Sequence, residues 1–276
     1  MHIAVLSGKG GTGKTTVATN LSKVMGYRYV DCDVEEPNGF IFLKPEILER
    51  REVSVPVPHI VPDLCTHCNV CVEICQFKAL ANTQKEILLF EQMCHGCGAC
   101  TFVCPAKAIG EKERTIGQIQ IGSYQGTECY CGILNLGEPM AGPIISQLKR
   151  FSDQQNTIFD CAPGSSCNVV KSIIDCDYAL LVTEPTLFGI HDLKIAVELV
   201  QQMGIPHGVI INCVESNENI INDYCQKEKI SIIGSIPFDK KIAILYSEGK
   251  LLVEQTDYHD LFYGIAHRLK GVTQCS

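Results

Sequence analysis

A glycine-rich run close to the N-terminus holds the residue types that bind phosphate. Gly8, Gly13, Lys14 and Thr15 match the pattern G-x-x-x-x-G-K-[ST]. The backbone N–H groups of such a loop point at phosphate oxygens, the lysine reaches the outer phosphates, and the hydroxyl binds Mg²⁺. An apolar run precedes the loop and a helical stretch follows it, as the motif requires. We therefore predict a nucleotide cradle made of Gly8, Lys9, Gly10, Gly11, Thr12, Gly13, Lys14, Thr15 and Thr16.

The cysteines form the second chemical pattern. The chain has 17 cysteines in 276 residues, and eight of them fall into two runs with the spacing C-x2-C-x2-C-x3-C. In bacterial ferredoxins, three thiolates of such a run bind one [4Fe–4S] cube and the fourth binds the other. We therefore expect one cube on Cys65, Cys68, Cys71 and Cys104, and the other on Cys94, Cys97, Cys100 and Cys75. Zinc is the alternative, but zinc ribbons space their C-x2-C pairs farther apart.

Two features depart from the usual ferredoxin run. Gln76 follows Cys75, where proline is usual, and His67 and His95 lie inside the runs. Because four cysteines already complete each cube, we expect both histidines to lie beside the clusters without binding iron. Gln76 is expected to alter local packing without removing a ligand.

Acidic residues end two of the predicted strands. The run 27–32 predicts a buried strand that leads into Asp33, and the run 157–160 predicts another that ends at Asp160. In parallel α/β sheets the carboxyl ends of the strands meet at one edge, where ligands bind. A carboxylate beside the phosphate loop can act on Mg²⁺ or on the attacking water. The sequence therefore places both acids at the nucleotide.

Lys9 adds a feature that phosphate binding alone does not demand. A lysine directly after the first glycine, together with D-x-D-x-x-x-P-N over residues 31–38 and D-x-x-P-G over residues 160–164, resembles the deviant phosphate-loop ATPases. This superfamily includes MinD, ParA, the Mrp-type iron–sulfur carriers and the nitrogenase iron protein. The resemblance covers nearly the full chain and implies an ATPase that closes as an ATP-sandwich homodimer.

The resemblance also implies a role for each motif residue. Lys9 would reach across the dimer to the partner's nucleotide, and Asp33 would position or activate the attacking water. Asp160 would contact Mg²⁺ through a water, and Gly164 would sense the γ-phosphate. The implied catalytic residues are Lys9, Lys14, Asp33 and Asp160, with Thr15 as the Mg²⁺ ligand.

Two residues at later strand ends are candidates for the adenine site. Asn212 ends the predicted strand 209–212, where superfamily members hold the base, and Pro237 follows the predicted strand 232–236. Contact with the base is one interpretation. A loop-capping asparagine and a turn proline are the other, and the sequence leaves both open.

Cys129 and Cys131 form a C-x-C pair outside the ferredoxin runs. Such a pair cannot complete a four-ligand site alone, but two copies could do so across a two-fold axis. The Mrp-type carriers and the nitrogenase iron protein share a cluster in that way, although their cysteines are placed differently. A bridging cluster, a free-thiol pair and a redox pair therefore all stay open.

Together these patterns predict an α/β fold with a doubly wound, mostly parallel sheet and an inserted small α+β ferredoxin domain. We expect residues 1–59 and 113–276 to form the ATPase domain and residues 60–112 the insertion. Pro56, Pro58 and Pro62 are expected to break regular structure at the junction. Residues 115–123 alternate apolar and polar side chains, so the chain is expected to re-enter the main sheet there.

Composition narrows the class of protein. A net charge of -8 argues against nonspecific binding to nucleic acid or to an anionic membrane. No apolar run approaches the roughly 20 residues of a membrane span, and the chain enters its first strand directly. We therefore expect a cytoplasmic protein without a signal peptide or stable membrane insertion. The spacing of apolar residues over 261–269 predicts a helix that packs on the domain.

The functional hypothesis is an ATP-hydrolysing iron–sulfur protein that uses ATP, Mg²⁺ and two [4Fe–4S] clusters. In this interpretation, nucleotide state is coupled to electron transfer to a redox partner protein. The first alternative is an assembly or carrier ATPase of the Mrp type, whose client would receive iron–sulfur or metal clusters. The second is a positioning ATPase like MinD, but neither a membrane-binding tail nor a basic DNA-binding face is evident.

Overall fold

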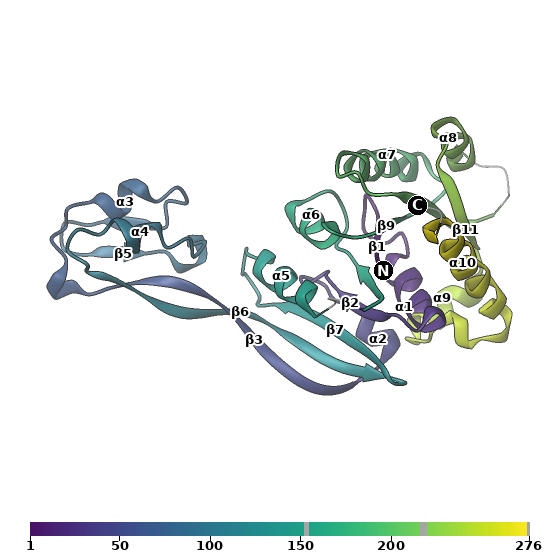
Figure 1. Cartoon of the computed structure of the whole chain (residues 1–276), viewed down its shortest axis with the longest axis horizontal. Coiled ribbons are helices and arrows are strands. Elements are labelled where there is room, and N and C mark those ends of the chain that lie inside the picture. The colour runs from purple at the N-terminus through teal and green to yellow at the C-terminus, as the bar shows by residue number, and fades with distance from the viewer. Residues whose placement is uncertain (152–154, 216–219, 275–276) are drawn as a thin grey trace. The chain divides into compact units, whose positions relative to one another are not determined.

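The computed structural model of the chain describes residues 1–151, 155–215 and 220–274. Over these residues the main sheet has nine strands, in the order β11-β10-β9-β1-β8-β2-β7-β6-β3 (Figure 1). The strands are β1 (His2–Leu6), β2 (Arg28–Asp31), β3 (Glu46–Ile60), β6 (Ile109–Tyr124), β7 (Thr127–Leu134), β8 (Thr157–Asp160), β9 (Tyr178–Thr183), β10 (His207–Val214) and β11 (Ser231–Pro237). The seven strands from β11 to β7 pair in parallel.

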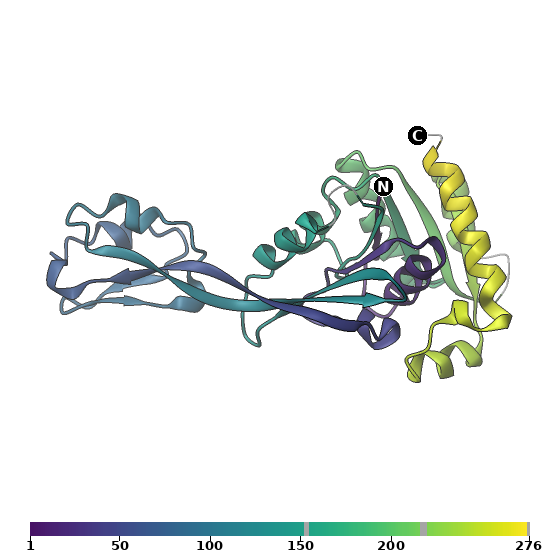
Figure 2. The same ribbon diagram turned by 60° about the horizontal axis from the view of Figure 1, so that its bottom comes forward.

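Helices cover both faces of this parallel sheet (Figures 1 and 2). Alternate residues of a strand face opposite sides, so Ile3 and Val5 join one core while Ala4 and Leu6 are buried on the other side. The first core also holds apolar residues of α1 (Lys14–Met25) and α10 (Thr256–Gln274). The opposite face is covered by α5 (Gly142–Arg150), α6 (Cys167–Ile173) and α7 (Leu187–Gln202). The prediction of an α/β fold with a mostly parallel sheet is confirmed.

The chain divides into two compact units. Unit 1 comprises Met1–Arg50, Ile119–Ile133 and Ile144–Ser276, and unit 2 comprises Arg51–Gln118 and Leu134–Pro143. Unit 1 also contains α2 (Gly39–Leu43), α8 (Ile220–Glu228), α9 (Lys240–Ser247) and a short 3-10 turn, Leu252–Glu254. These units are defined by packing. The predicted limits of an inserted domain, 60–112, stay a prediction.

Unit 2 repeats one local structure. A 3-10 turn, a cysteine loop and a short helix occur twice, and the two helices pack together. The same backbone conformation recurs, because Asn69 and Gly98 have φ of 70° and 71°, and Lys78 and Lys107 have φ of 54° and 50°. The elements are the 3-10 turns Pro62–Leu64 and Glu91–Met93, helices α3 (Val70–Ile74) and α4 (Ala99–Val103), and the antiparallel strands β4 (Leu80–Asn82) and β5 (Ile87–Leu89).

The prediction that Pro56 and Pro58 break regular structure is wrong. Strand β3 continues through both to Ile60, and only Pro62 ends it by starting a 3-10 turn. The physical reason is that β3 is the last strand of the sheet, and an edge strand tolerates proline where the missing N–H would face away from its neighbour. Pro56 and Pro58 are two residues apart, so both point their nitrogens the same way.

The C-terminal helix packs on unit 1, as predicted. Phe262, Ile265 and Leu269 of α10 are fully buried in the same core as α1. Across residues 1–151, 155–215 and 220–274, no helix is both long enough and apolar enough to cross a membrane.

Candidate functional site

The phosphate loop lies between β1 and α1, at the middle of the parallel sheet. Gly13 has a φ of 93°, and a Cβ atom there would come within 2.4 Å of the Asn212 side-chain nitrogen, so only glycine fits. Lys14 is only 7% exposed. The hydroxyl of Thr12 is buried and has no hydrogen-bond partner among the described residues. Buried donors without partners are the groups that a phosphate would satisfy.

A cavity of about 500 Å³ opens beside this loop. It brings together many of the residues predicted from sequence, since its lining includes Gly10, Gly11, Gly13, Lys14, Thr15, Thr16, Asp33, Asn212 and Pro237. Gly8, Lys9, Thr12, Asp160 and Gly164 do not line it. The cavity wall also holds two aromatic residues, Phe238 and Tyr246, that the sequence analysis did not single out. Neither residue belongs to a sequence motif, because only the fold brings the two side chains to the cavity.

Asp160 lies buried at the end of β8, directly opposite Asp31 at the end of β2. Its Oδ2 accepts a hydrogen bond of 2.9 Å from the Tyr29 hydroxyl, whereas its Oδ1 has no partner within the described chain. Burial raises the pKa of Asp160, and the nearby Thr15 hydroxyl and Lys14 ammonium lower it in part. An unpaired carboxylate oxygen beside a threonine hydroxyl fits a Mg²⁺ ion held through water.

Asp33 follows β2 and faces the cavity as a half-buried carboxylate. Burial raises its pKa to about 6; the Lys14 ammonium opposes that rise, and the Asp160 carboxylate adds to it. A carboxylate with a pKa near neutrality can orient water and exchange protons under ordinary conditions. Burial and the facing Asp160 also raise the pKa of Asp31 well above its usual range.

The segment after β8 contacts both the phosphate loop and the segment after β2. The Gly164 N–H donates to the Ser7 carbonyl at 2.9 Å, which ties the predicted γ-phosphate sensor to the start of the loop. The Asn168 side chain donates to Glu35 at 3.4 Å. Through Asn168, the start of α6 (Cys167–Ile173) is therefore linked to the predicted first switch, and Gly164 is linked to the phosphate loop.

Lys9 forms an ion pair within its own chain, with Glu184 at 3.4 Å. Both side chains are partly exposed, and exposed ion pairs contribute only about 0–1 kcal/mol. Opening this pair to let Lys9 reach another molecule would therefore cost little.

Asn212 lies within β10, and its side chain donates to the Thr12 carbonyl at 2.9 Å. The amide is thus bound to the phosphate loop in this structure. Pro237 is the last residue of β11, next to Phe238. Both line the cavity, so the base-contact interpretation and the structural one stay open for them.

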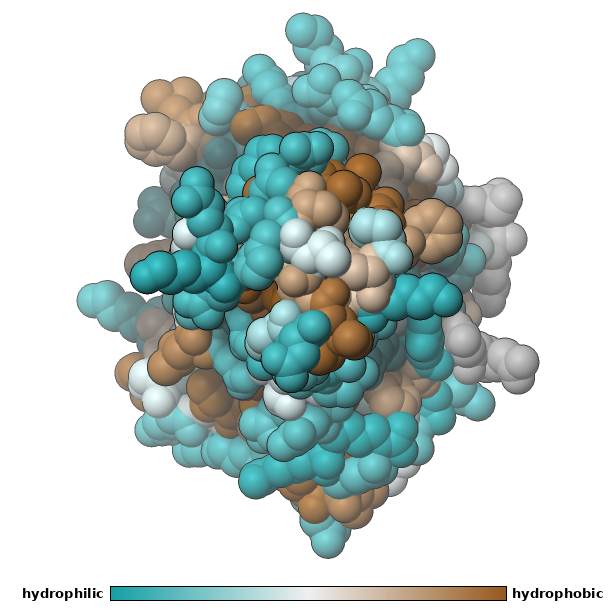
Figure 3. Space-filling view, turned by 90° about the vertical axis from the view of Figure 1, so that its left-hand side faces the viewer, coloured by the Kyte–Doolittle hydropathy of each residue, from teal (hydrophilic) through white to brown (hydrophobic). Residues whose placement is uncertain are grey.

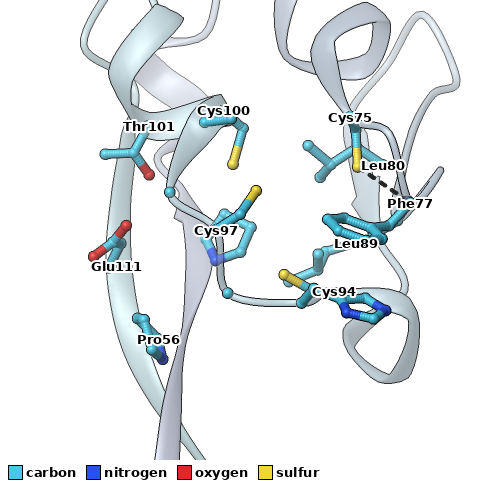
Figure 4. Close-up of a pocket in the computed structure, with 16 residues that line it drawn as sticks. Pro56, Cys75, Phe77, Leu80, Leu89, Cys94, Cys97, Cys100, Thr101 and Glu111 are labelled. Carbon is cyan, nitrogen blue, oxygen red and sulfur yellow. Dashed lines mark hydrogen bonds between the residues drawn. The ribbon is translucent and has the colours of Figure 1, made fainter. Parts of the chain in front are cut away.

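Two cavities in unit 2 are lined by cysteines. One has Cys75, Cys94, Cys97 and Cys100 in its wall. Figure 4 shows the sulfur atoms of these four residues directed toward a common space. The second has Cys65, Cys68, Cys71 and Cys104 in its wall. Each cavity is thus lined by one of the two sets of four cysteines that the spacing predicts.

The fourth cysteine of each run is held in the same way. The Ala79 N–H donates to the Cys75 sulfur and the Ala108 N–H donates to the Cys104 sulfur, both at 3.3 Å. Amide donors of this kind stabilise thiolate and tune cluster potential. No group of three His, Cys, Asp or Glu side chains in the described residues is arranged to hold a single metal ion.

The two histidines lie beside the cysteine cavities. His95 stacks on Phe77 with ring centroids 3.9 Å apart, and both rings line the first cavity. His67 lines the second and has a φ of 53°, where the matching residue of the other run is Gly96. Gln76 lines neither cavity.

Cys129 and Cys131 lie on β7 inside unit 1, and both are buried. Burial raises the pKa of the Cys129 thiol to about 12 and raises that of Cys131 strongly as well. Both sulfurs contact backbone carbonyls of their own strand. Buried, protonated thiols fit core residues better than ligands shared between two copies.

A phosphate loop after the central strand of a parallel sheet, with acidic residues ending two neighbouring strands, defines the class of phosphate-loop ATPases. The profile of the CobQ/CobB/MinD/ParA nucleotide-binding domain matches residues 3–253. The chain therefore belongs to this family and is an ATPase of the MinD/ParA type.

Relatives and solved structures extend over nearly the whole chain. An uncharacterised protein of Methanocaldococcus jannaschii is 32% identical over 275 residues. The matched region covers 97% of this chain and 97% of that protein. MinD of Pyrococcus horikoshii, solved as a complex with Mg-ADP, has 19% identity and a TM-score of 0.61, covering 99% of this chain and 98% of its own. The MinC:MinD complex of Aquifex aeolicus has 17% identity and a TM-score of 0.59, covering 98% and 96%.

Proposed function

We propose that this chain is an ATP-hydrolysing iron–sulfur protein that couples nucleotide state to electron transfer through two [4Fe–4S] clusters to a partner protein. The observation that carries this proposal is the pair of unit 2 cavities, each lined by four cysteines. Sets of thiolates alone suit iron–sulfur clusters. Each cysteine of a cube binds a different iron, so the four donors need not converge on one point. Bound clusters would supply one-electron carriage.

In unit 1 the proposal assigns the ordinary parts of phosphoryl transfer. Lys14 and the loop amides hold the phosphates of ATP, and Thr15 holds Mg²⁺ with Asp160 behind it. Asp33 orients the attacking water. The buried free oxygen of Asp160 and the cavity wall support this assignment. The Mg-ADP complex of the similar P. horikoshii MinD also supports it.

We further propose that the chain acts as a homodimer closed around ATP. Lys9 is not needed for its own phosphate cradle, and its present ion pair with Glu184 is weak enough to open. In the dimer Lys9 would contact the nucleotide of the partner chain. MinD of A. aeolicus, which is similar to this chain, was solved in a complex with another protein, MinC.

A redox partner would dock on unit 2, close to the cysteine cavities. Phe102 lies two residues after the proposed ligand Cys100 on α4 and is 92% exposed. The exposed apolar residues of this unit also include Leu64, Phe90 and Met93. Apolar side chains also appear, in brown, among polar ones on the surface shown in Figure 3. Exposed aromatic and methionine side chains are typical of protein-binding surfaces.

The order of elements along the chain gives coupling a physical route. The predicted first switch, residues 33–38, leads through α2 into β3, and β3 continues into unit 2. Hydrolysis changes the contacts of switch segments. A movement of residues 33–38 would therefore act on the strand that enters the cysteine unit.

Anaerobic purification tests the proposal. We expect about eight irons and eight sulfides per chain and the EPR signal of reduced [4Fe–4S] clusters. The signal should change when ATP is added. Stoichiometric zinc, or iron for one cube only, would contradict the assignment of two cubes.

A carrier ATPase is the second candidate, and one observation favours it. Cys68 and Cys97, one from each predicted ligand set, are exposed. Exposed ligands make a cluster accessible to an acceptor. If iron passes to a chelator faster while ATP is hydrolysed, that result would support cluster transfer over electron carriage. A cluster that stays bound through many turnovers would support electron carriage.

A further inference from the structure

Tyr29 is a fully buried tyrosine on β2, within the nucleotide-binding half of the sheet. Its hydroxyl lies 2.9 Å from Oδ2 of Asp160 and 3.2 Å from Oδ2 of Asp31. It therefore joins the two acidic residues that end β8 and β2. Tyrosine supplies a single O–H donor, and the sheet interior holds the ring rigidly in place.

Asp31 in turn holds both ends of the predicted first switch. Its Oδ1 accepts the N–H of Asp33 at 3.2 Å, and its Oδ2 accepts the N–H of Gly39 at 2.9 Å. Residues 33–38 thus form a loop that is held at both ends. The N–H of Asp33 at its start and the N–H of Gly39 just after its end both donate to the Asp31 carboxyl group. A Cβ atom on Gly39 would come within 1.9 Å of the Tyr29 hydroxyl, so the tyrosine also requires glycine at that point.

We infer that Tyr29 and Asp31 are positioning residues for the ATPase reaction. Through hydrogen bonds they fix Asp160 relative to the loop that carries Asp33. The geometry joins the proposed Mg²⁺ side of the site to the proposed water-orienting side without either residue lining the nucleotide cavity. The inference rests on the roles proposed above for Asp160 and Asp33. Positioning of this kind matters because small displacements of catalytic groups cost large factors in rate.

The test is Tyr29→Phe, which removes only the hydroxyl. Hydrogen bonds to charged groups contribute enough that we expect the Mg²⁺ concentration for half-maximal activity to rise and kcat to fall, each roughly tenfold. The KM for ATP should change less than about twofold, because the phosphate loop is untouched. If the hydroxyl had only a structural role, the variant would have a lower thermal midpoint. Its Mg²⁺ requirement would then not rise more than its KM for ATP.

Tyr130→Phe is the matched control. Tyr130 is also buried, lies on the neighbouring strand β7, and donates to Glu128 away from the nucleotide. This variant should keep the Mg²⁺ dependence of the unchanged protein. Equal effects of Tyr29→Phe and Tyr130→Phe, or no effect of Tyr29→Phe on Mg²⁺ dependence and kcat, would overturn the inference.

Asp31→Asn provides a second variant, because an amide has one oxygen and can accept from only one end of the loop. If Tyr29 and Asp31 act along one path, the double variant should lose less than the product of the two single losses. If the loss in the double variant equals the product of the two single losses, Tyr29 and Asp31 act independently, and the shared path would be overturned. Asp160→Ala in the same assay separates this inference from the proposed function: unchanged Mg²⁺ dependence there would remove the assigned role of Asp160 itself.

Discussion

In unit 1 the nucleotide site gathers residues from distant parts of the chain, whereas in unit 2 each cysteine cavity draws its cysteines from positions 65–104. Lys14, Asp33, Asp160 and Asn212 meet only because parallel strands end at one edge of the sheet. Behind them lies a large apolar core that needs no ligand. In the cysteine-bearing part of unit 2, one small apolar cluster has Cys71, Leu80, Ile87 and Ile109 as its buried residues.

This contrast predicts that the two units depend on their ligands to different degrees. Cys71 is a predicted cluster ligand and also a core residue, and Cys65, Cys100 and Cys104 pack against the same core. Small domains with little apolar core usually take part of their folding free energy from metal. Unit 1 should therefore keep its structure without nucleotide, while unit 2 should lose much of its structure without clusters.

The largest expected effect is the loss of a whole cube from unit 2. Cys100→Ser removes one proposed ligand, and iron should fall from about eight to about four per chain. Cys167→Ser is the control, because Cys167 is exposed and belongs to neither ligand set. Nucleotide binding to unit 1 should survive in both variants. Full iron content in Cys100→Ser, measured by iron and sulfide analysis, would contradict the ligand assignment.

Lys14→Ala should produce the converse result. Loss of a charge-assisted contact to phosphate is expected to weaken ATP binding roughly 10- to 150-fold, measured by calorimetry. Iron content should stay the same, because the lysine lies in the other unit. A variant that binds ATP normally would show that the loop does not hold the phosphates.

The pH dependence of hydrolysis tests Asp33. Its raised pKa of about 6 means that the carboxylate is ionised above that pH and protonated below it. If Asp33 orients water as a carboxylate, kcat should fall as pH drops through 6, reaching roughly a tenth of its plateau at pH 5. Cluster content should be measured in parallel so that acid loss of iron is not mistaken for this effect. A flat profile from pH 5 to pH 8 would remove Asp33 from that role.

The smallest expected signal concerns Lys9 acting between chains. Lys9→Ala and Asp33→Ala should each be inactive, but a mixed dimer holds one site with both residues intact. Random mixing makes half of the dimers mixed, so activity should return to about a quarter of the unchanged value. Proven mixed dimers without activity would place Lys9 in its own site.

Much of unit 1 is readable from sequence, because local signals and fold agree there. The apolar run before the phosphate loop is β1, and the helical stretch after the loop is α1. The continuation of β3 through Pro56 could not be predicted, since it depends on the strand lying at the sheet edge. The contacts of Tyr29 with Asp31 and Asp160 were also hidden, because they arise from the register of β2 against β8 and no motif marks them.

The most direct test of the account is a potentiometric titration followed by EPR, with and without a nonhydrolysable ATP analogue. We predict two [4Fe–4S] signals whose midpoint potentials shift when the analogue binds. A typical coupling of about 1–3 kcal/mol corresponds to roughly 5- to 150-fold in affinity, or about 59 mV for each tenfold in a one-electron couple. ATP should then bind oxidised and reduced protein with affinities that differ by the same factor. Identical potentials in both titrations, with equal ATP affinity in both redox states, would contradict coupling between the two units.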